Sequence, residues 1–198
     1  MAKYKVGDFD ITVKQELRLG KGAFGYVIKC KHKDGWDAAA KHIDLMQFDE
    51  TIVEKERIPL IKQLKHPNII QMYDCHISAE RAWIIMEICR CDLQTLLKDK
   101  GDDLTVDKFI NISRQCCAGV AALHERDLVH RDIKINNYLC MDNGDCIKLS
   151  DFSLCKDLSE SLASYMETSC GHRDWVAPEL LNDYGGMARG KGQPLYHR

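Results

Sequence analysis

Two short segments in the second half of the sequence carry the residue types that phosphoryl transfer requires. Residues 130–137 read HRDIKINN. Within them Asp132 supplies a carboxylate, Lys134 follows it by two residues and Asn137 by five. A loop with these groups can hold a hydroxyl nucleophile, a phosphate and a metal ion. Asp151, which opens the later segment DFS, would supply a second, anionic metal ligand.

Three glycines near the start of the sequence, Gly20, Gly22 and Gly25, lie where an early strand is expected to turn back. Backbone amides without side chains can approach phosphate oxygens closely at such a turn. The same pattern also fits a simple glycine-rich hairpin. A strand, an Asp-Gly turn and another strand follow it, and not the helix that a dinucleotide-binding fingerprint requires.

Lys41 ends a run of three alanines, residues 38–40, on the third expected strand. Its ammonium group would reach inward over these small side chains toward nucleotide phosphates. A lysine on a strand is usually only a solvated charge. The spacing after the glycine turn and the apolar flanks favour the phosphate-binding role.

The order of the expected elements predicts an α+β protein with two lobes. Residues 10–44 are predicted to form three strands of an antiparallel sheet, and 68–77 and 81–88 two more, with a helix at 50–64 between them. From Asp92, a candidate N-cap, the chain turns helical. A long helix should then present one apolar stripe, made of Phe109, Ile112, Cys116, Val120 and Leu123. A ligand would lie between the lobes.

Composition excludes several classes of protein. The 198 residues are 45% hydrophobic and 29% charged with a net charge of −2, which indicates neither a nucleic-acid nor a membrane surface. The first residues lack a secretion signal and no apolar run could cross a bilayer, so we expect a cytoplasmic protein. The ten cysteines contain no C-x-x-C pair, which favours reduced thiols over a zinc site. Residues 182–198 are predicted to be disordered.

Taken in order, six motifs resemble those of the eukaryotic protein kinase family over residues 10–181. They are the glycine turn, Ala38 to Lys41, His66 to Ile69, His130 to Asp132 with Asn137, Asp151 to Ser153, and Ala177 to Glu179. The resemblance implies a bilobed kinase fold with an N-terminal lobe at 10–88, a hinge at 87–92 and a partial C-terminal lobe at 92–181. It also implies ATP and Mg²⁺ as cofactors and a protein as substrate.

The resemblance assigns a role to each polar group. Asp132 would orient the substrate hydroxyl and accept its proton, Asn137 and Asp151 would hold Mg²⁺, and Lys41 would hold the phosphates of ATP. Lys134 matches the lysine that serine/threonine kinases place beside the γ-phosphate, so serine or threonine is the expected acceptor.

The resemblance also outlines an adenine site. Met86 matches the gatekeeper residue, and the hinge from Glu87 to Cys89 would bind the adenine edge through its backbone. Val27, Ala39 and Leu139 would enclose the base. All these apolar residues would also pack in a core without any ligand.

Two further expectations concern structure and regulation. His130 and Phe152 should stack in the apolar spine that links the lobes, with no acid–base role for the histidine. The segment after Asp151 is rich in hydroxyl groups, and a phosphate there, for example on Thr168 or Ser169, could pair with Arg131. Parts of this segment are also similar to the kinase domain of the inositol-requiring stress sensors, which join a kinase to an endoribonuclease.

The helix that should provide a glutamate partner for Lys41 departs from the family pattern. Counting back from the HPNI motif reaches Arg57, and Pro59 would kink the helix. A kink could bring Glu56 or Glu54 into register, and we favour Glu56.

Other departures bear on activity. Ser153 replaces the family's glycine and should restrict the backbone, and His172 replaces a threonine that contacts the catalytic loop. The sequence ends soon after Glu179, so the resemblance implies a truncated C-terminal lobe. Its uncovered apolar faces predict aggregation, a protein partner that covers the lobe, or a fragment of a longer product. Three hypotheses follow: an active serine/threonine kinase, a catalytically silent module that binds nucleotide or a partner, and an incomplete fragment.

Overall fold

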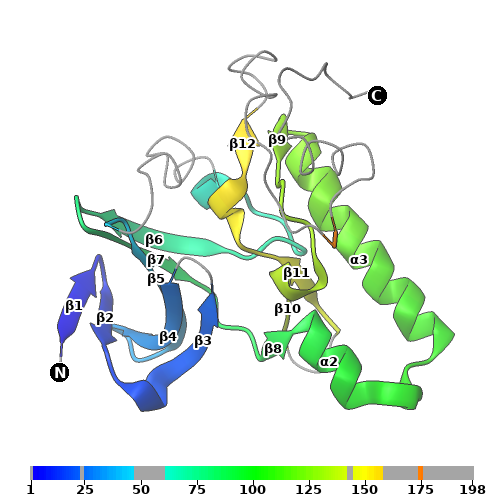
Figure 1. Ribbon diagram of the computed structural model, residues 1–198, viewed down its shortest axis with the longest axis horizontal. Coiled ribbons are helices and arrows are strands. Elements are labelled where there is room, and N and C mark those ends of the chain that lie inside the picture. Colours follow the sequence, from blue (N-terminus) through cyan, green and yellow to red (C-terminus); the bar gives the residue numbers. More distant parts are fainter. Residues whose placement is uncertain (1, 23–24, 47–60, 142–144, 158–173, 176–198) are drawn as a thin grey trace, which may run out of the picture.

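The computed structural model describes residues 2–22, 25–46, 61–141, 145–157 and 174–175. It confirms an α+β protein with two lobes, a strand-rich one and a helical one (Figure 1). Several predictions concern residues outside these described ranges. They concern most of the helix at 50–64, Glu56, Glu54, the hydroxyl-rich segment, His172, the motif at 177–179 and the tail.

The N-terminal lobe is a single antiparallel sheet of seven strands in the order β1-β2-β4-β5-β7-β6, with β3 paired to β4. The strands are β1 (Lys3–Val6), β2 (Phe9–Thr12), β3 (Arg18–Gly22), β4 (Gly25–His32), β5 (Asp37–Asp44), β6 (Met72–Ile77) and β7 (Arg81–Met86). The predicted Asp-Gly hairpin joins β4 to β5, and Gly35 adopts the positive φ of 90° that this turn needs. The predicted first strand is divided, because a 3₁₀ turn at Gln15–Leu17 separates β2 from β3.

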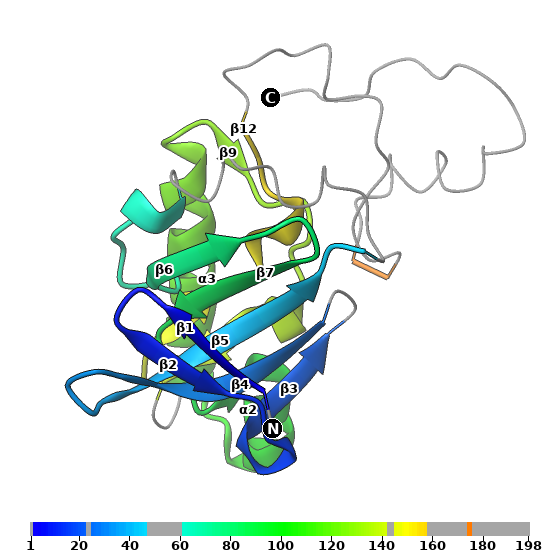
Figure 2. The same ribbon diagram turned by 90° about the vertical axis from the view of Figure 1, so that its left-hand side faces the viewer.

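The hairpin of β1 and β2 begins before residue 10 and was not predicted. Figure 2 shows the hairpin in front of β5. The hairpin's buried residues Val6, Phe9 and Ile11 pack in one cluster with residues of β4, β5 and β7, so the hairpin covers one face of the sheet. The Tyr4 and Trp83 rings lie 5.3 Å apart, and Phe9 packs edge-on against Trp36 at 5.3 Å. Phe9 is 5% exposed. Alternating apolar residues around the Gly7 turn were the signal for this hairpin.

The aromatic contacts predict that Phe9→Ala lowers the free energy of unfolding by about 3 kcal/mol, because truncating a buried aromatic leaves a cavity. Urea denaturation followed by circular dichroism measures this change. The matched control is Phe109→Ala, since Phe109 is 54% exposed and its truncation should change stability little. Equal effects of the two substitutions would contradict a core under the hairpin.

The C-terminal lobe consists of two helices, short strands and 3₁₀ turns. The helices are α2 (Leu93–Lys100) and α3 (Val106–His124), and the strands are β8 (Cys91–Asp92), β9 (Leu128–Val129), β10 (Tyr138–Cys140), β11 (Ile147–Leu149) and β12 (Lys156–Asp157). The predicted N-cap is confirmed, because the Asp92 carboxylate accepts a hydrogen bond from the Thr95 amide at 2.7 Å. Strands β11, β10 and β8 form one small sheet, and β12 pairs with β9.

The apolar stripe of α3 packs against β11, but one predicted member is wrong. Ile112 and Leu123 are buried, and a Cβ on Gly119 would come within 2.5 Å of the Asn68 carbonyl oxygen, so the helix lies very close to that loop. Phe109 is exposed instead of buried. Ile112, Gly119 and Leu123 recur along one line of the helix at 100° per residue, and Phe109 lies to one side of that buried line.

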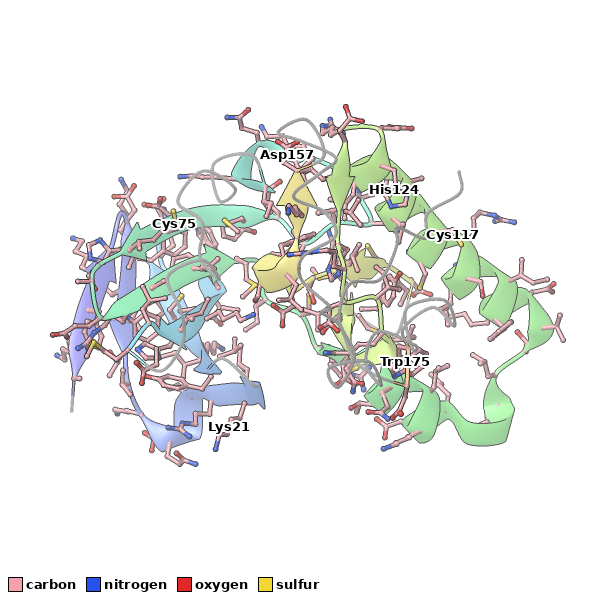
Figure 3. The ribbon with its side chains drawn as sticks, turned by 45° about the horizontal axis from the view of Figure 1, so that its top comes forward. Lys21, Cys75, Cys117, His124, Asp157 and Trp175 are labelled. Atoms are coloured by element: carbon pink, nitrogen blue, oxygen red, sulfur yellow. The ribbon has the colours of Figure 1, made fainter. Side chains whose placement is uncertain are left out.

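Nine of the ten cysteines lie in the described residues. All nine cysteines in the described residues are free, and among those residues no cluster of His, Cys, Asp and Glu side chains could hold a metal ion. Figure 3 shows Cys117 on the outer side of α3. Within the same part of the chain, no helix combines the length and the hydropathy needed to cross a membrane.

Candidate active site

His130 anchors the catalytic loop that follows β9. The Asp132 amide donates to His130 Nδ1 at 3.3 Å, so Nε2 carries the proton and donates to the Ser150 carbonyl at 2.8 Å. The ring also packs edge-on against Phe152 with 5.3 Å between centroids. His130 is 1% exposed, and this burial lowers its pKa below the usual 6.5. The neutral ring therefore joins the catalytic loop to the DFS segment, as expected for a structural residue.

The lowered pKa of His130 predicts a pH-dependent stability. Below pH 6.5 the unfolded chain binds a proton that the folded chain excludes, so stability should fall as pH falls. His130→Phe keeps an aromatic ring and should lessen this slope below pH 6.5, by at most about 1.4 kcal/mol per pH unit for one proton. Urea denaturation at a series of pH values below 6.5 measures the slope. An unchanged slope in His130→Phe would contradict a neutral, buried ring.

Asp132, Lys134 and Asn137 meet in one hydrogen-bonded group. Lys134 Nζ lies 2.6 Å from Asp132 Oδ2, and Asn137 Nδ2 donates to the same oxygen at 2.8 Å and to the Asp132 carbonyl at 2.7 Å. Asp132 is 8% exposed and Asn137 6%. Within the described residues both side-chain bonds therefore fall on Oδ2, which leaves Oδ1 of Asp132 to face a substrate hydroxyl.

The orientation of Asn137 suits a metal ligand. Its Nδ2 is occupied by two bonds to Asp132, so its Oδ1 is the side-chain atom available to a cation. Its backbone is held in place because the amide and hydroxyl of Ser150 both donate to its carbonyl, each at 2.8 Å. Asn137 is thus held in position by Ser150, which lies between β11 and Asp151.

Lys41 and Asp151 form an ion pair between the lobes. Lys41 Nζ on β5 lies 2.5 Å from Asp151 Oδ1, and the two side chains are 13% and 30% exposed. Burial alone would raise the pKa of Asp151, but the charge and hydrogen bond of Lys41, with a hydrogen bond from Ser153, lower it to about 2. Asp151 has a φ of 60°, a left-handed conformation that directs its carboxylate toward the lysine.

Ser153 also contacts the lysine, since Lys41 Nζ donates to Ser153 Oγ at 3.1 Å. Sequence reasoning expected Ser153 to restrict the backbone where the family has glycine. In the structure Ser153 lies inside the 3₁₀ turn Phe152–Leu154, and the positive φ falls on Asp151 instead. The serine therefore fits without backbone strain. The predicted partner Glu56 lies outside the described residues.

Arg131 adopts a left-handed φ of 62°, and its Nε donates to the Leu154 carbonyl at 2.7 Å. Its buried Nη1 has no hydrogen-bond partner within the described part of the chain. The phosphate that we expected to pair with Arg131 would lie on residues outside that part, so this expectation stays a prediction.

The predicted phosphate-binding glycines lie in the paired strands β3 and β4, where Gly20 is the register partner of Val27 and Gly22 pairs with Gly25. A Cβ on Gly25 would come within 1.9 Å of the His42 carbonyl oxygen, so the fold itself requires this glycine. A Cβ on Gly20 would meet nothing within 4 Å. This open space would let a phosphate group approach the Gly20 backbone closely. Figure 3 shows Lys21 on β3, beside this turn.

The predicted adenine residues lie on strands that meet at the hinge. Ala39 on β5 is the register partner of Met86 on β7, and Leu139 on β10 pairs with Asp92 and Lys148. Val27 is the register partner of Lys41. Burial raises the pKa of Cys89 to about 12, with the Glu87 charge adding to it, so this hinge thiol is protonated at neutral pH.

Sequence reasoning missed an ion pair between Glu87, in the hinge, and Lys148. Glu87 Oε1 lies 2.9 Å from Lys148 Nζ on β11 and accepts the Gln71 amide at 2.6 Å. The two charged side chains are only 13% and 12% exposed. The signal was Lys148 itself, a charge between Ile147 and Leu149 in a short apolar strand. This pair connects the two lobes at the hinge.

We expect Lys148→Met to lower the free energy of unfolding by roughly 3 kcal/mol, because it leaves the Glu87 carboxylate nearly buried without its cation. Adding Glu87→Gln should recover most of this loss, since no charge then remains unpaired. Thermal and urea unfolding of the single and double variants test both expectations. The control is Lys98→Met on the exposed side of α2. A double variant less stable than Lys148→Met would contradict the ion pair.

The residues present fit ATP with Mg²⁺. Asn137 Oδ1 and the Asp151 carboxylate are oxygen donors, which Mg²⁺ prefers, and this ion commonly takes one or two protein groups together with substrate phosphates. Lys41 would pair with the phosphates, and the open backbone at Gly20 would approach them.

Comparisons with known proteins agree with this geometry. The protein kinase domain family matches residues 13–191. Serine/threonine-protein kinase dst1 of Dictyostelium discoideum is 33% identical over 174 residues, which cover 86% of this chain and 23% of that protein. Mitogen-activated protein kinase kinase kinase 3 of Arabidopsis thaliana is 36% identical over 182 residues, covering 88% and 29%. Mitogen-activated protein kinase kinase kinase kinase 3 of Homo sapiens is 33% identical, covering 82% and 18%.

The bilobed fold, the site and the family match place this chain in one class: it belongs to the protein kinase family. The chain spans less than a third of the length of each of these three relatives. The hairpin of β1 and β2 precedes the matched residues.

Proposed function

We propose that this chain is a serine/threonine protein kinase domain that transfers the γ-phosphate of ATP, with Mg²⁺, to a hydroxyl group of a protein. The observation that carries the proposal is the convergence of Asp132, Lys134 and Asn137 in the C-terminal lobe with the Lys41–Asp151 pair between the lobes. Free thiols in the described residues support a reducing compartment such as the cytoplasm.

The described side chains account for the chemistry as follows. Asp132 Oδ1 accepts a hydrogen bond from the acceptor hydroxyl and takes its proton as the oxygen attacks phosphorus in line. Lys134, 2.6 Å from Asp132 Oδ2, keeps that carboxylate oriented and offers a positive charge to the transferred phosphoryl group. Lys41 holds the remaining phosphates. Mg²⁺, held by Asn137 and Asp151 when bound, neutralises charge on the phosphate oxygens.

The choice of serine or threonine as acceptor rests on two observations. Lys134 matches the lysine that the family resemblance places beside the γ-phosphate in serine/threonine kinases, and it directly contacts the proposed base, Asp132. One of the relatives above is named a serine/threonine-protein kinase.

The proposal predicts that Asp132→Asn lowers phosphate transfer to a serine-containing protein substrate by at least 100-fold, because the base is lost while the shape is kept. Stabilisation by ATP with Mg²⁺ in thermal unfolding should persist. Asp103→Asn, at an exposed position before α3, is the control and should transfer phosphate at the wild-type rate. Radiolabelled ATP measures the transfer.

Other outcomes of this experiment separate the alternatives. Stabilisation of the wild-type chain by the nucleotide without transfer would select a silent binding module. A wild-type chain that does not unfold cooperatively would indicate a fragment without independent function. Equal transfer by Asp132→Asn and the wild type would exclude Asp132 as the base.

A further inference from the structure

Three groups form a closed triangle of hydrogen bonds at the boundary between the lobes. Lys41 Nζ donates to Asp151 Oδ1 at 2.5 Å and to Ser153 Oγ at 3.1 Å, and Ser153 Oγ donates to the same Asp151 Oδ1. Lysine and aspartate are 110 residues apart in the sequence, so this triangle joins β5 of one lobe to the DFS segment of the other.

The chemistry of the three groups fixes the direction of every bond. An ammonium group can only donate and an ionised carboxylate can only accept, whereas a hydroxyl can do both. Ser153 uses its oxygen to accept from Lys41 and its hydrogen to donate to Asp151. A glycine or alanine at this position would leave the ion pair with its single direct bond.

The triangle also orients the carboxylate. Within the described residues both hydrogen bonds to the Asp151 side chain fall on Oδ1, and none falls on Oδ2. Two bonds on one oxygen restrict rotation of the carboxylate about its χ2 torsion, which is otherwise broad. The second oxygen is then held in one direction and stays available to a cation.

We propose that Ser153 is a positioning residue that holds Asp151 against Lys41 and thereby presents Asp151 Oδ2 for Mg²⁺ coordination. The inference deepens the proposed function, on which it rests for the identity of the metal and nucleotide. Ser153 does not contact the reacting atoms. It acts through Lys41 and Asp151, and its place in a 3₁₀ turn holds the hydroxyl next to both.

Substitutions at one position test the proposal in the full chain. Ser153→Gly restores the residue that the family pattern has, Ser153→Ala removes only the hydroxyl, and Ser153→Thr keeps it. Ser113→Ala, at a half-buried position of α3, is the control. Calorimetric titration of Mg²⁺ into each variant with a non-hydrolysable ATP analogue gives the metal affinity.

We expect the Mg²⁺ dissociation constant to rise about tenfold in Ser153→Gly and Ser153→Ala, the effect of one hydrogen bond to a charged group. It should stay within about twofold of wild type in Ser153→Thr and Ser113→Ala, because both keep the Ser153 hydroxyl or its equivalent. Nucleotide affinity without Mg²⁺ should change less than metal affinity. Equal Mg²⁺ affinity in all variants, or no recovery in Ser153→Thr, would overturn the proposal.

A second measurement needs neither metal nor activity. Nitrogen-resolved NMR of the Lys41 ammonium group should show hydrogens protected from exchange in wild type and Ser153→Thr, and exchanging faster in Ser153→Gly. Unchanged exchange in Ser153→Gly would overturn the proposal. If the wild-type chain binds Mg²⁺ and nucleotide but transfers no phosphate, the proposed function fails while the metal titration and the exchange rates still decide the role of Ser153.

Discussion

The ion pair between Lys41 and Asp151 is the constraint on which the site depends. It lies at the boundary of the lobes, with one partner on a long strand of the N-terminal sheet and the other at a left-handed residue after β11. Charges that are 13% and 30% exposed are stable there because each compensates the other. Whatever moves one lobe relative to the other changes this contact, so the geometry of the proposed metal site and the closure of the lobes are coupled.

Each partner is supported by a different kind of packing. Lys41 lies on the central part of a seven-stranded sheet, whose outer side is closed by the β1–β2 hairpin and its aromatic contacts. Asp151 follows β11, which is enclosed by α3 and joined to the catalytic loop through His130 and Ser150. A second ion pair, Glu87 with Lys148, holds the same two lobes at the hinge. Two charge pairs therefore link the lobes, together with the backbone hydrogen bonds that Leu149 makes with Asn68 and Ile70.

Much of this arrangement was predictable because the responsible patterns are local. The Asp-Gly hairpin between β4 and β5, the N-cap at Asp92 and the helical period of α3 depend on neighbours within a few residues. The predictions failed where a distant element decides burial. Phe109 has the spacing of a core residue but lies beside the buried line of α3 and is 54% exposed, and the hairpin before residue 10 is stabilised by rings from β6 and β7.

The sequence by itself determined which groups take part, since the types and spacings of Asp132, Lys134, Asn137, Asp151 and Lys41 already indicate phosphoryl transfer. Only the tertiary structure decided how they are paired. Ser153 was expected to be a backbone restriction and is instead a hydroxyl shared by Lys41 and Asp151. Lys148 carried no assignment and is the partner of Glu87. Residue type and spacing describe local chemistry, whereas a contact across 110 residues is set by how the two lobes fold together.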